Sequence, residues 1–466
     1  MRLLVVTPDY ASHWFPLSAV AAAARARGAD VGVATGPALR ARVQADGFRW
    51  LSLRMSRGSN AGIAGRDDPD DDLRAFFAAT RRGMVATLRQ QADARGDDLL
   101  WEPTRVAADV LRLLDRVRPD AVLVDHLAFS TTLALRAAAR PFTTFVPGHP
   151  TQLPVAGEVY GFPTAWPAAV DASVDGDALG ALRARCEDVR NAFTERYNRA
   201  LRVLSRDAEP VPDAFAAHGT DVLYNSPAVL HPPTRAGSLP DRHAFLGSCV
   251  RDEAPDAVTS AWLARRADEP FAYVSFGTFL SARDDVLHRV VTGLRTLGVD
   301  VAMATGSADP GVLGALPPAW LVAPSLPQVT LVRRATAVVT HGGNNTVTET
   351  LDAGAPMVVL PFSTDQFAIA ADLQRTGLGI ALDPNAATAA DVAGALAAIT
   401  SSGPGALAAT IGRRIRDHPG PDVAADRLVG PAAADGVAGS RDASGQRVAV
   451  PGEVDAGRAV GHGIDR

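Results

Sequence analysis

The sequence predicts an α/β protein with two doubly wound parallel sheets, and three observations support this prediction. Short runs of branched apolar residues at 3–7 and 31–35 flank a helical pattern at 17–27. A strand, a helix and a second strand within about 35 residues form a βαβ unit, which implies a parallel sheet covered by helices. The apolar runs return at 121–125 and 142–146, and a second series of the same kind follows a proline-rich stretch.

Two domains follow from this periodicity. Between residues 226 and 256 the pattern fails and prolines crowd together, which is typical of a linker. The second series then predicts strands at 271–276, 299–304, 337–340 and 357–360. We therefore expect an N-terminal domain at 1–225, a linker at 226–256, a C-terminal domain at 257–430 and a disordered tail at 431–466.

The amino-acid composition is typical of a globular protein and excludes several classes of function. The chain has 466 residues, of which 47% are hydrophobic, and this is enough apolar material for two full cores. The net charge of −5 offers no basic surface for a nucleic-acid partner. All 46 basic residues are Arg, which excludes enzymes that need a Lys, such as Walker-A NTPases and Schiff-base enzymes.

The cysteines and the first residues give no sign of export or of membrane insertion. Cys186 and Cys249 are far apart in the chain and predict neither a disulfide framework nor a zinc site. The apolar stretch after Met1 and Arg2 is too short for a signal peptide or a membrane span. We therefore expect a cytoplasmic protein with no membrane span.

A turn suited to an anion follows the predicted strand at 337–340. Residues 341–343 read His-Gly-Gly, and a helical pattern begins near 344. Unpaired N–H groups at a helix start attract phosphate, and glycine lets the backbone approach it closely. Thr346 adds a hydroxyl donor, and Glu349 offers acceptors for ribose hydroxyls. By itself, this stretch fits an ordinary capped helix after a glycine turn about equally well.

Further polar residues belong to the same edge of the second sheet. Asp365 and Gln366 follow the predicted strand at 357–360, and together they offer acceptors and donors for hydroxyl groups. Gln328 precedes an apolar run, and Thr278 follows the first strand of this series. Because the carboxyl ends of parallel strands meet at one edge, these clusters predict a site for a nucleotide that carries a polyhydroxy group.

These motifs resemble the family 1 glycosyltransferases of the GT-B fold, a group that includes bacterial antibiotic and macrolide glycosyltransferases. The resemblance covers residues 271–382, and it implies two Rossmann-like domains facing a cleft. It also implies an NDP-sugar donor, with UDP or dTDP left open because Ser325 stands where many members have a base-stacking Trp. The donor-binding residues that it implies are Thr278, Gln328, His341, Gly342, Gly343, Asn345, Thr346, Glu349, Asp365 and Gln366.

The resemblance assigns a role to most of these residues. His341 and Thr346 would hold the diphosphate, and Glu349 would hold the ribose. Asp365 and Gln366 would hold the sugar hydroxyls. The resemblance further implies inversion at the anomeric carbon, no metal, and no cofactor besides the NDP-sugar that serves as co-substrate.

A candidate general base follows the first strand. His13 begins a His-x-x-Pro sequence that resembles the family's catalytic histidine, and Asp125 matches the aspartate that orients it. A hydroxyl acceptor must lose a proton as it attacks, and a neutral imidazole is a suitable base near pH 7. His126 could be confused with this partner, but successive strand residues point in opposite directions. A histidine bonded only to backbone is the alternative for His13.

Aromatic residues in the N-terminal half are candidate walls for an apolar acceptor. We select Trp14, Phe76 and Phe145, although an aromatic residue is more often part of a core. The resemblance implies a small natural-product acceptor such as a polyketide, and a homodimer is compatible with it. The predicted function is therefore glycosyl transfer in natural-product or antibiotic biosynthesis.

Two other functions remain open at this point. A catalytically silent homologue would bind nucleotide or activate a partner, but it has no need to keep His13, Asp125, Asp365 and Gln366 together. A GT-B-type sugar-nucleotide epimerase would use the same donor site, but it needs additional carboxylates that the sequence does not reveal. A nicotinamide-dependent oxidoreductase is excluded, because the first strand is not followed by a Gly-x-Gly-x-x-Gly turn.

Overall fold

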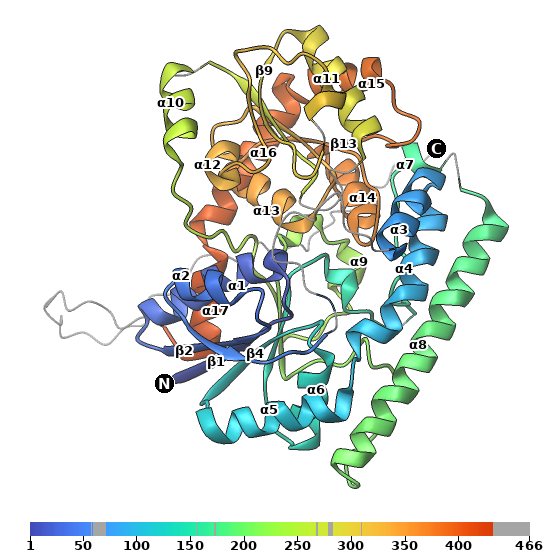
Figure 1. The fold of residues 1–466 in the computed structure, drawn as a ribbon, viewed down its shortest axis with the longest axis vertical. Helices are drawn as coiled ribbons and strands as arrows, with labels where there is room; N and C mark the ends of the chain where they lie inside the picture. The colour runs from blue at the N-terminus through green and yellow to red at the C-terminus, as the bar shows by residue number, and fades with distance from the viewer. Residues whose placement is uncertain are drawn as a thin grey trace, which may run out of the picture. The chain divides into compact units, whose positions relative to one another are not determined.

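A computed structural model describes residues 1–56, 58, 71–155, 157–171, 174–266, 269–277, 283–308 and 310–431. Residues 1–431 form one compact unit that contains two parallel sheets (Figure 1). Thr278, one of the donor-binding residues that the resemblance implies, lies outside the described residues. All but the first residue of the tail predicted at 431–466 lies outside them as well.

The first sheet has seven parallel strands in the order β3-β2-β1-β4-β5-β6-β7. These strands are β1 Arg2–Val6, β2 Asp30–Thr35, β3 Arg49–Ser52, β4 Ala121–Asp125, β5 Thr143–Val146, β6 Asp221–Tyr224 and β7 His243–Phe245. The helices of this half are α1 Ala11–Ala26, α2 Arg40–Ala45, α3 Asp71–Arg82, α4 Met84–Leu99, α5 Pro103–Val117, α6 Phe129–Ala137, α7 Ala168–Asp171, α8 Gly176–Leu204 and α9 Pro233–Ala236, with 3-10 turns η1 Pro150–Gln152 and η2 Ala228–Leu230. We call this sheet and these helices the N-terminal half.

The second sheet has six parallel strands in the order β10-β9-β8-β11-β12-β13. These strands are β8 Phe271–Ser275, β9 Asp300–Ala304, β10 Leu321–Ala323, β11 Ala337–Thr340, β12 Met357–Val359 and β13 Gly379–Ala381. The helices that follow the N-terminal half are α10 Ala257–Arg266, α11 Asp284–Leu297, α12 Gln328–Val332, α13 Asn344–Ala353, α14 Gln366–Thr376, α15 Ala389–Ile399, α16 Ser402–Asp417 and α17 Gly420–Val429, with the 3-10 turn η4 Pro310–Leu313. We call the second sheet with α10 to α16 the C-terminal half.

Alternate residues of the central strands belong to different cores. In β1, Leu3 and Val5 pack with α1, whereas Leu4 and Val6 pack with α5 and α6. Figure 1 shows α1 and α2 on one side of the first sheet and α5 and α6 on the other. Side chains alternate along a strand, so a strand buried on both faces is a continuous apolar run, as the sequence predicted for this segment.

Helix α1 begins earlier than the sequence predicted. It starts at Ala11 rather than at Leu17, and Pro16 lies inside it. Because proline has no N–H, Pro16 leaves the carbonyl of Ser12 without its usual partner within the helix. Because α1 starts at Ala11, His13 lies on the first turn of a helix and not in a loop.

The segment predicted as a linker contributes to the first sheet. Residues 243–245 form β7, which pairs in parallel with the edge strand β6. Prolines surround this strand in the sequence, so its local pattern does not predict a strand. This strand forms because the backbone groups at the edge of β6 are available to pair with residues 243–245.

The last described helix packs against the N-terminal half. Ala424, Ala425 and Leu428 of α17 are buried in the same cluster as the residues of α1, and Figure 1 shows α17 beside α1. The Arg27 guanidinium pairs with the carboxylates of Asp422, at 3.0 Å, and Asp426, at 2.7 Å. This helix lies in the stretch that the sequence assigned to the C-terminal domain.

Among the described residues, no single helix is both long and apolar enough to cross a membrane. The segments 389–399 and 403–429 reach the required length and composition only as a pair, and they are bent by 63° relative to each other.

Candidate active site

Both sheets reverse their strand order at one point, and the predicted site residues gather there. In the first sheet the reversal lies between β1 and β4, which lead to His13 and Asp125. In the second sheet it lies between β8 and β11, which lead to Gly277 and His341. Ligands of open α/β sheets bind outside the carboxyl ends of strands at such a switch point.

His13 and Asp125 form a hydrogen-bonded pair, as the sequence predicted. The Nδ1 atom of His13 lies 2.8 Å from Oδ2 of Asp125. The His13 side chain keeps 16% of its surface exposed, whereas Asp125 is fully buried. Because a carboxylate only accepts, Nδ1 carries a proton, and in the neutral form of the ring the lone pair is then on Nε2.

The position of Asp125 is set by the ends of two neighbouring strands. Its Oδ1 accepts a hydrogen bond from the backbone N–H of Leu127 at 2.9 Å, and its Oδ2 accepts one from the Thr7 hydroxyl at 3.4 Å. The ring of His126 instead packs edge-on against Phe129. Asp125 is therefore the residue that contacts the His13 ring, whereas His126 packs against Phe129.

Tyr10 flanks the histidine and was not predicted from the sequence. Its ring lies edge-on to the His13 ring, with centroids 5.6 Å apart. Its hydroxyl donates to Asp98 at 2.9 Å, and burial, together with that carboxylate, raises the pKa of the phenol. A cluster of one aspartate, one tyrosine and one histidine at the end of the first strand was not recognisable in the sequence, because Asp98 is far away along the chain.

The ring of His341 lies between two glycines that have no side chain to collide with it. A Cβ on Gly343 would lie 2.5 Å from Nε2 of His341, and one on Gly277 would lie 3.0 Å from Cε1. Burial lowers the pKa of His341 to about 4. The imidazole is therefore neutral near pH 7 and can donate one hydrogen bond to an anion without bringing a charge of its own.

Glu349 lies at the centre of a buried polar network. Its Oε1 accepts from Nη1 of Arg251 at 3.0 Å, and its Oε2 accepts from Nε2 of Gln328 at 2.7 Å. Burial raises the pKa of Glu349, while the Arg251 guanidinium opposes that rise. The Thr346 hydroxyl is 3.4 Å from Oε1 of Gln328, so three of the predicted donor residues lie together. Arg251 was not predicted, because the sequence places it in the expected linker.

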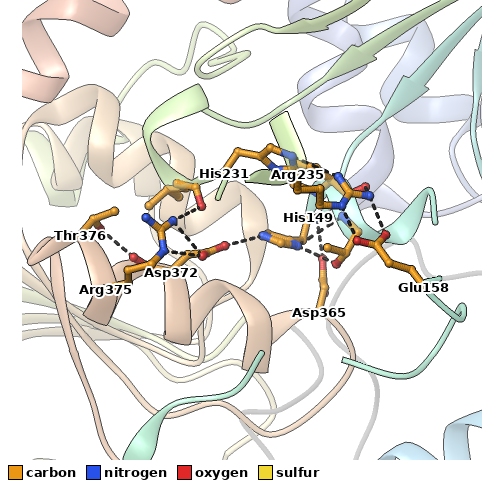
Figure 2. Close-up of polar contacts among 11 residues, drawn as sticks. His149, Glu158, His231, Arg235, Asp365, Asp372, Arg375 and Thr376 are labelled. Atoms are coloured by element: carbon orange, nitrogen blue, oxygen red, sulfur yellow. Dashed lines mark hydrogen bonds and ion pairs between the residues drawn. The ribbon is translucent and has the colours of Figure 1, made fainter. Parts of the chain in front are cut away.

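The two residues predicted to hold sugar hydroxyls are engaged differently. Gln366 turns its carboxamide into its own loop, where Oε1 accepts from the backbone N–H groups of Phe362 and Ser363 at 2.9 and 3.1 Å. Asp365 instead faces the N-terminal half and accepts at Oδ2 from the backbone N–H of His149 at 2.8 Å (Figure 2). In the described conformation, Asp365 therefore reaches between the halves, whereas Gln366 does not.

The three aromatic residues predicted as acceptor walls are core residues, which corrects that prediction. Trp14 and Phe145 are fully buried in the cluster of α1, and the indole N–H of Trp14 donates to Asp46 at 2.7 Å. Phe76 on α3 is buried in a core of the C-terminal half. Large aromatic side chains bury more apolar area than most others, so packing is their commonest role.

A further predicted donor residue lies at the contact between the two halves. Asn345, predicted to bind the donor, donates from Nδ2 to the backbone carbonyl of Ser12 at 2.6 Å and so joins the two halves beside His13. Within the described ranges, no group of three or more His, Cys, Asp or Glu side chains is arranged to hold a metal ion.

The chain is similar to known sugar transferases. Residues 243–403 match the family model described as UDP-glucoronosyl and UDP-glucosyl transferase. The chain is 25% identical to 4'-demethylrebeccamycin synthase of Lentzea aerocolonigenes, over 85% of this chain and 91% of that protein. It is 30% identical to NDP-glycosyltransferase YjiC of Bacillus licheniformis, over 45% of this chain and 52% of that protein, so this alignment spans about half of the relative.

The fold is also that of a solved glycosyltransferase. The crystal structure of the glycotransferase of kitacinnamycin superposes with a TM-score of 0.66 at 20% identity, covering 91% of this chain and 97% of that one. The architecture of two parallel sheets with sites at both switch points is therefore the GT-B fold. The chain is therefore similar to glycosyltransferases in sequence over residues 243–403 and in fold over most of its length.

Proposed function

We propose that the protein transfers a sugar from a nucleoside-diphosphate sugar to a hydroxyl group of a small, largely apolar natural product, with inversion at the anomeric carbon. The observation that carries this proposal is the 2.8 Å contact between His13 Nδ1 and Asp125 Oδ2 at the switch point of the first sheet. The Asn345 contact to Ser12 ties the helix that carries His13 to α13, the proposed phosphate-binding helix. The names of the two relatives, a rebeccamycin-type synthase and an NDP-glycosyltransferase, add support.

The proposed chemistry is a single displacement. Nε2 of His13 accepts the proton of the acceptor hydroxyl while the oxygen of that hydroxyl attacks the anomeric carbon. The bond from the anomeric carbon to the diphosphate breaks, and the nucleoside diphosphate leaves with the electron pair. Asp125 stabilises the imidazolium that forms, and a base of this kind contributes about 10²- to 10⁴-fold to the rate.

The donor would be held by the C-terminal half without a metal ion. N–H groups at the start of α13 and the neutral His341 donate hydrogen bonds to the diphosphate, which offsets its charge as it departs. Glu349 accepts from the ribose, and Asp365 accepts from a hydroxyl of the sugar. Because Arg251 already pairs with Glu349, the ribose has to share that carboxylate with the guanidinium or displace it.

Calorimetric titration and a transfer assay test the proposal. Wild-type protein is titrated with UDP and with dTDP in the presence of a chelator, and we expect one of the two to bind. The preferred nucleotide then selects the NDP-sugars to be incubated with hydroxylated apolar acceptors. NMR of the product should report an anomeric configuration opposite to that of the donor. Absence of binding by both nucleotides, or a retained configuration, would contradict the proposal.

A further inference from the structure

Gln152 reaches from the N-terminal half to the carboxylate proposed to bind the donor sugar. It is the last residue of η1, which follows β5, and its Nε2 donates to Oδ2 of Asp365 at 2.9 Å. The same oxygen accepts from the backbone N–H of His149 at 2.8 Å. Two donors from one loop of the N-terminal half therefore orient this carboxylate.

The loop that carries His149 and Gln152 makes a second contact, to a carboxylate of α14. Nε2 of His149 lies 2.9 Å from Oδ2 of Asp372, and both side chains are buried. Figure 2 shows the His149 ring between Asp372 and Arg235, with Asp365 close to the His149 backbone. Asp365 directly precedes α14, and Asp372 lies about two turns further along the helix, so the loop contacts both of these carboxylates.

The other end of the Gln152 carboxamide has no hydrogen-bond partner among the residues that the structure describes. A carboxylate can only accept hydrogen bonds, so the amide nitrogen must face Asp365 and Oε1 must point away from that contact. Oε1 is buried, and none of the described residues donates a hydrogen bond to it. Because buried acceptors are nearly always satisfied in folded proteins, this position is suited to a hydrogen-bond donor from a ligand.

Gly148 provides the space for this carboxamide. A Cβ at position 148 would lie 2.3 Å from Nε2 and 2.4 Å from Oε1 of Gln152. The backbone of Gly148 is not in the left-handed region, so the position needs glycine for the absent side chain and not for its backbone freedom. An alanine at 148 would therefore displace the carboxamide without removing any polar group.

We propose that Gln152 is a sugar-binding residue that the N-terminal half supplies to the donor site: its Nε2 holds Asp365, and its Oε1 accepts a hydrogen bond from a hydroxyl of the transferred sugar. This inference rests on the proposed function. Recognition of the sugar then depends on both halves at once, whereas recognition of the nucleotide depends on the C-terminal half.

The test compares donors with and without the sugar. We expect Gln152→Ala to raise KM for the NDP-sugar about tenfold, the size expected for the loss of a buried hydrogen bond, and to leave the inhibition constant of the free nucleoside diphosphate unchanged. Gly148→Ala should reproduce this split because it displaces the same carboxamide. Gln44→Ala, at an exposed position on α2, is the matched control and should change neither constant.

A deoxygenated donor identifies the contact. If Gln152 binds a sugar hydroxyl, removal of that hydroxyl and the Gln152→Ala substitution are not additive, because each removes the same hydrogen bond. Equal losses for the NDP-sugar and the free nucleotide, or full additivity with every deoxygenated donor, would overturn the inference. If wild-type protein neither binds nucleotide nor transfers sugar, the proposed function fails first and the inference fails with it.

Discussion

The carboxamide of Asn345 donates a hydrogen bond to the backbone carbonyl of Ser12, with 2.6 Å between Nδ2 and O. That carbonyl precedes His13 and belongs to the first turn of α1, where Pro16 is four residues further along. Because proline has no N–H, Pro16 cannot donate to the Ser12 carbonyl within the helix. The Ser12 carbonyl is therefore free to accept from Asn345 of the C-terminal half. Through this hydrogen bond α13, the helix proposed to bind phosphate, helps to position the turn of α1 that carries His13.

The first prediction concerns this contact. Asn345→Ala should lower kcat about tenfold at saturating substrates, since one hydrogen bond that positions His13 is lost. Pro16→Ala should also lower kcat, because it restores an N–H that competes for the Ser12 carbonyl. The same substitution should raise the melting temperature, because an internal helix proline is unfavourable. Steady-state kinetics and thermal unfolding measure both quantities, and an unchanged kcat in Asn345→Ala would remove the positioning role.

The second prediction concerns the His13–Asp125 pair. Asp125→Asn keeps the shape of the side chain but presents a neutral amide to Nδ1, so the tautomer needed for catalysis is no longer favoured. We expect kcat to fall about 10²- to 10⁴-fold with an alcohol acceptor. An acidic phenol acceptor, already partly ionised, should show a smaller loss. An equal loss for both acceptors would argue against a role in proton removal.

The third prediction concerns the glycines around His341. Gly343→Ala would place a Cβ 2.5 Å from Nε2 of His341 and so displace the ring. We expect affinity for the preferred nucleoside diphosphate to fall about tenfold, equivalent to a lost hydrogen bond to a charged group. Gly394→Ala on α15 is the control, because the Cβ meets no atom within 4 Å. Calorimetric titration compares the variants, and equal affinities would show that His341 does not contact the nucleotide.

The fourth prediction concerns stability in acid. Burial lowers the pKa of His126 from the ordinary 6.5 to about 4, and neither ring nitrogen has a hydrogen-bond partner among the described residues. Between these values the unfolded chain binds a proton that the folded chain does not. The free energy of unfolding should therefore decrease as the pH falls from 6.5 towards 4, by up to about 1.4 kcal/mol per pH unit for this residue.

Urea unfolding across this pH range tests the contribution of His126. His126→Leu should lose less stability than the wild type between neutral and acid pH, because a leucine takes up no proton on unfolding. His418→Leu, at an exposed position, is the matched control. Identical pH dependence in wild type and His126→Leu would contradict a neutral buried imidazole. His231, His243 and His341 also have a pKa lowered by burial, so part of the slope should persist in the variant.

Much of the fold was predictable because parallel strands that are buried on both faces leave a local signal. β1 and β4 each contain four consecutive apolar residues, and the helices between them follow a separate period. β7 was not predictable, because a strand of three residues at a sheet edge depends on the neighbouring β6 for its hydrogen bonds. The start of α1 was also misplaced, because proline inside a helix is unfavourable and Pro16 nevertheless lies within α1.

The site residues, like the secondary-structure elements, were predictable only where the signal is local. Residue types and spacing were enough to select His13 and Asp125, and the structure brings these two together. They were not enough to predict which polar groups are already engaged. Gln366 turns inward to its own loop, and Glu349 is paired with Arg251 from the expected linker. The pairing of Glu349 with Arg251 joins segments that are distant along the chain, so no local pattern records it.

The sequence by itself determined the class of fold, the His-Gly-Gly turn before α13 and the residues suited to a base and its partner. These features are local, because they depend on side-chain periodicity and on residue types within a few positions. Only the tertiary structure decided that Trp14 is a core residue, that Asn345 holds the carbonyl of Ser12 and that Gln152 faces Asp365. Those relationships depend on how two separately wound sheets meet, and the hydrogen bonds between the halves exist only after both have folded.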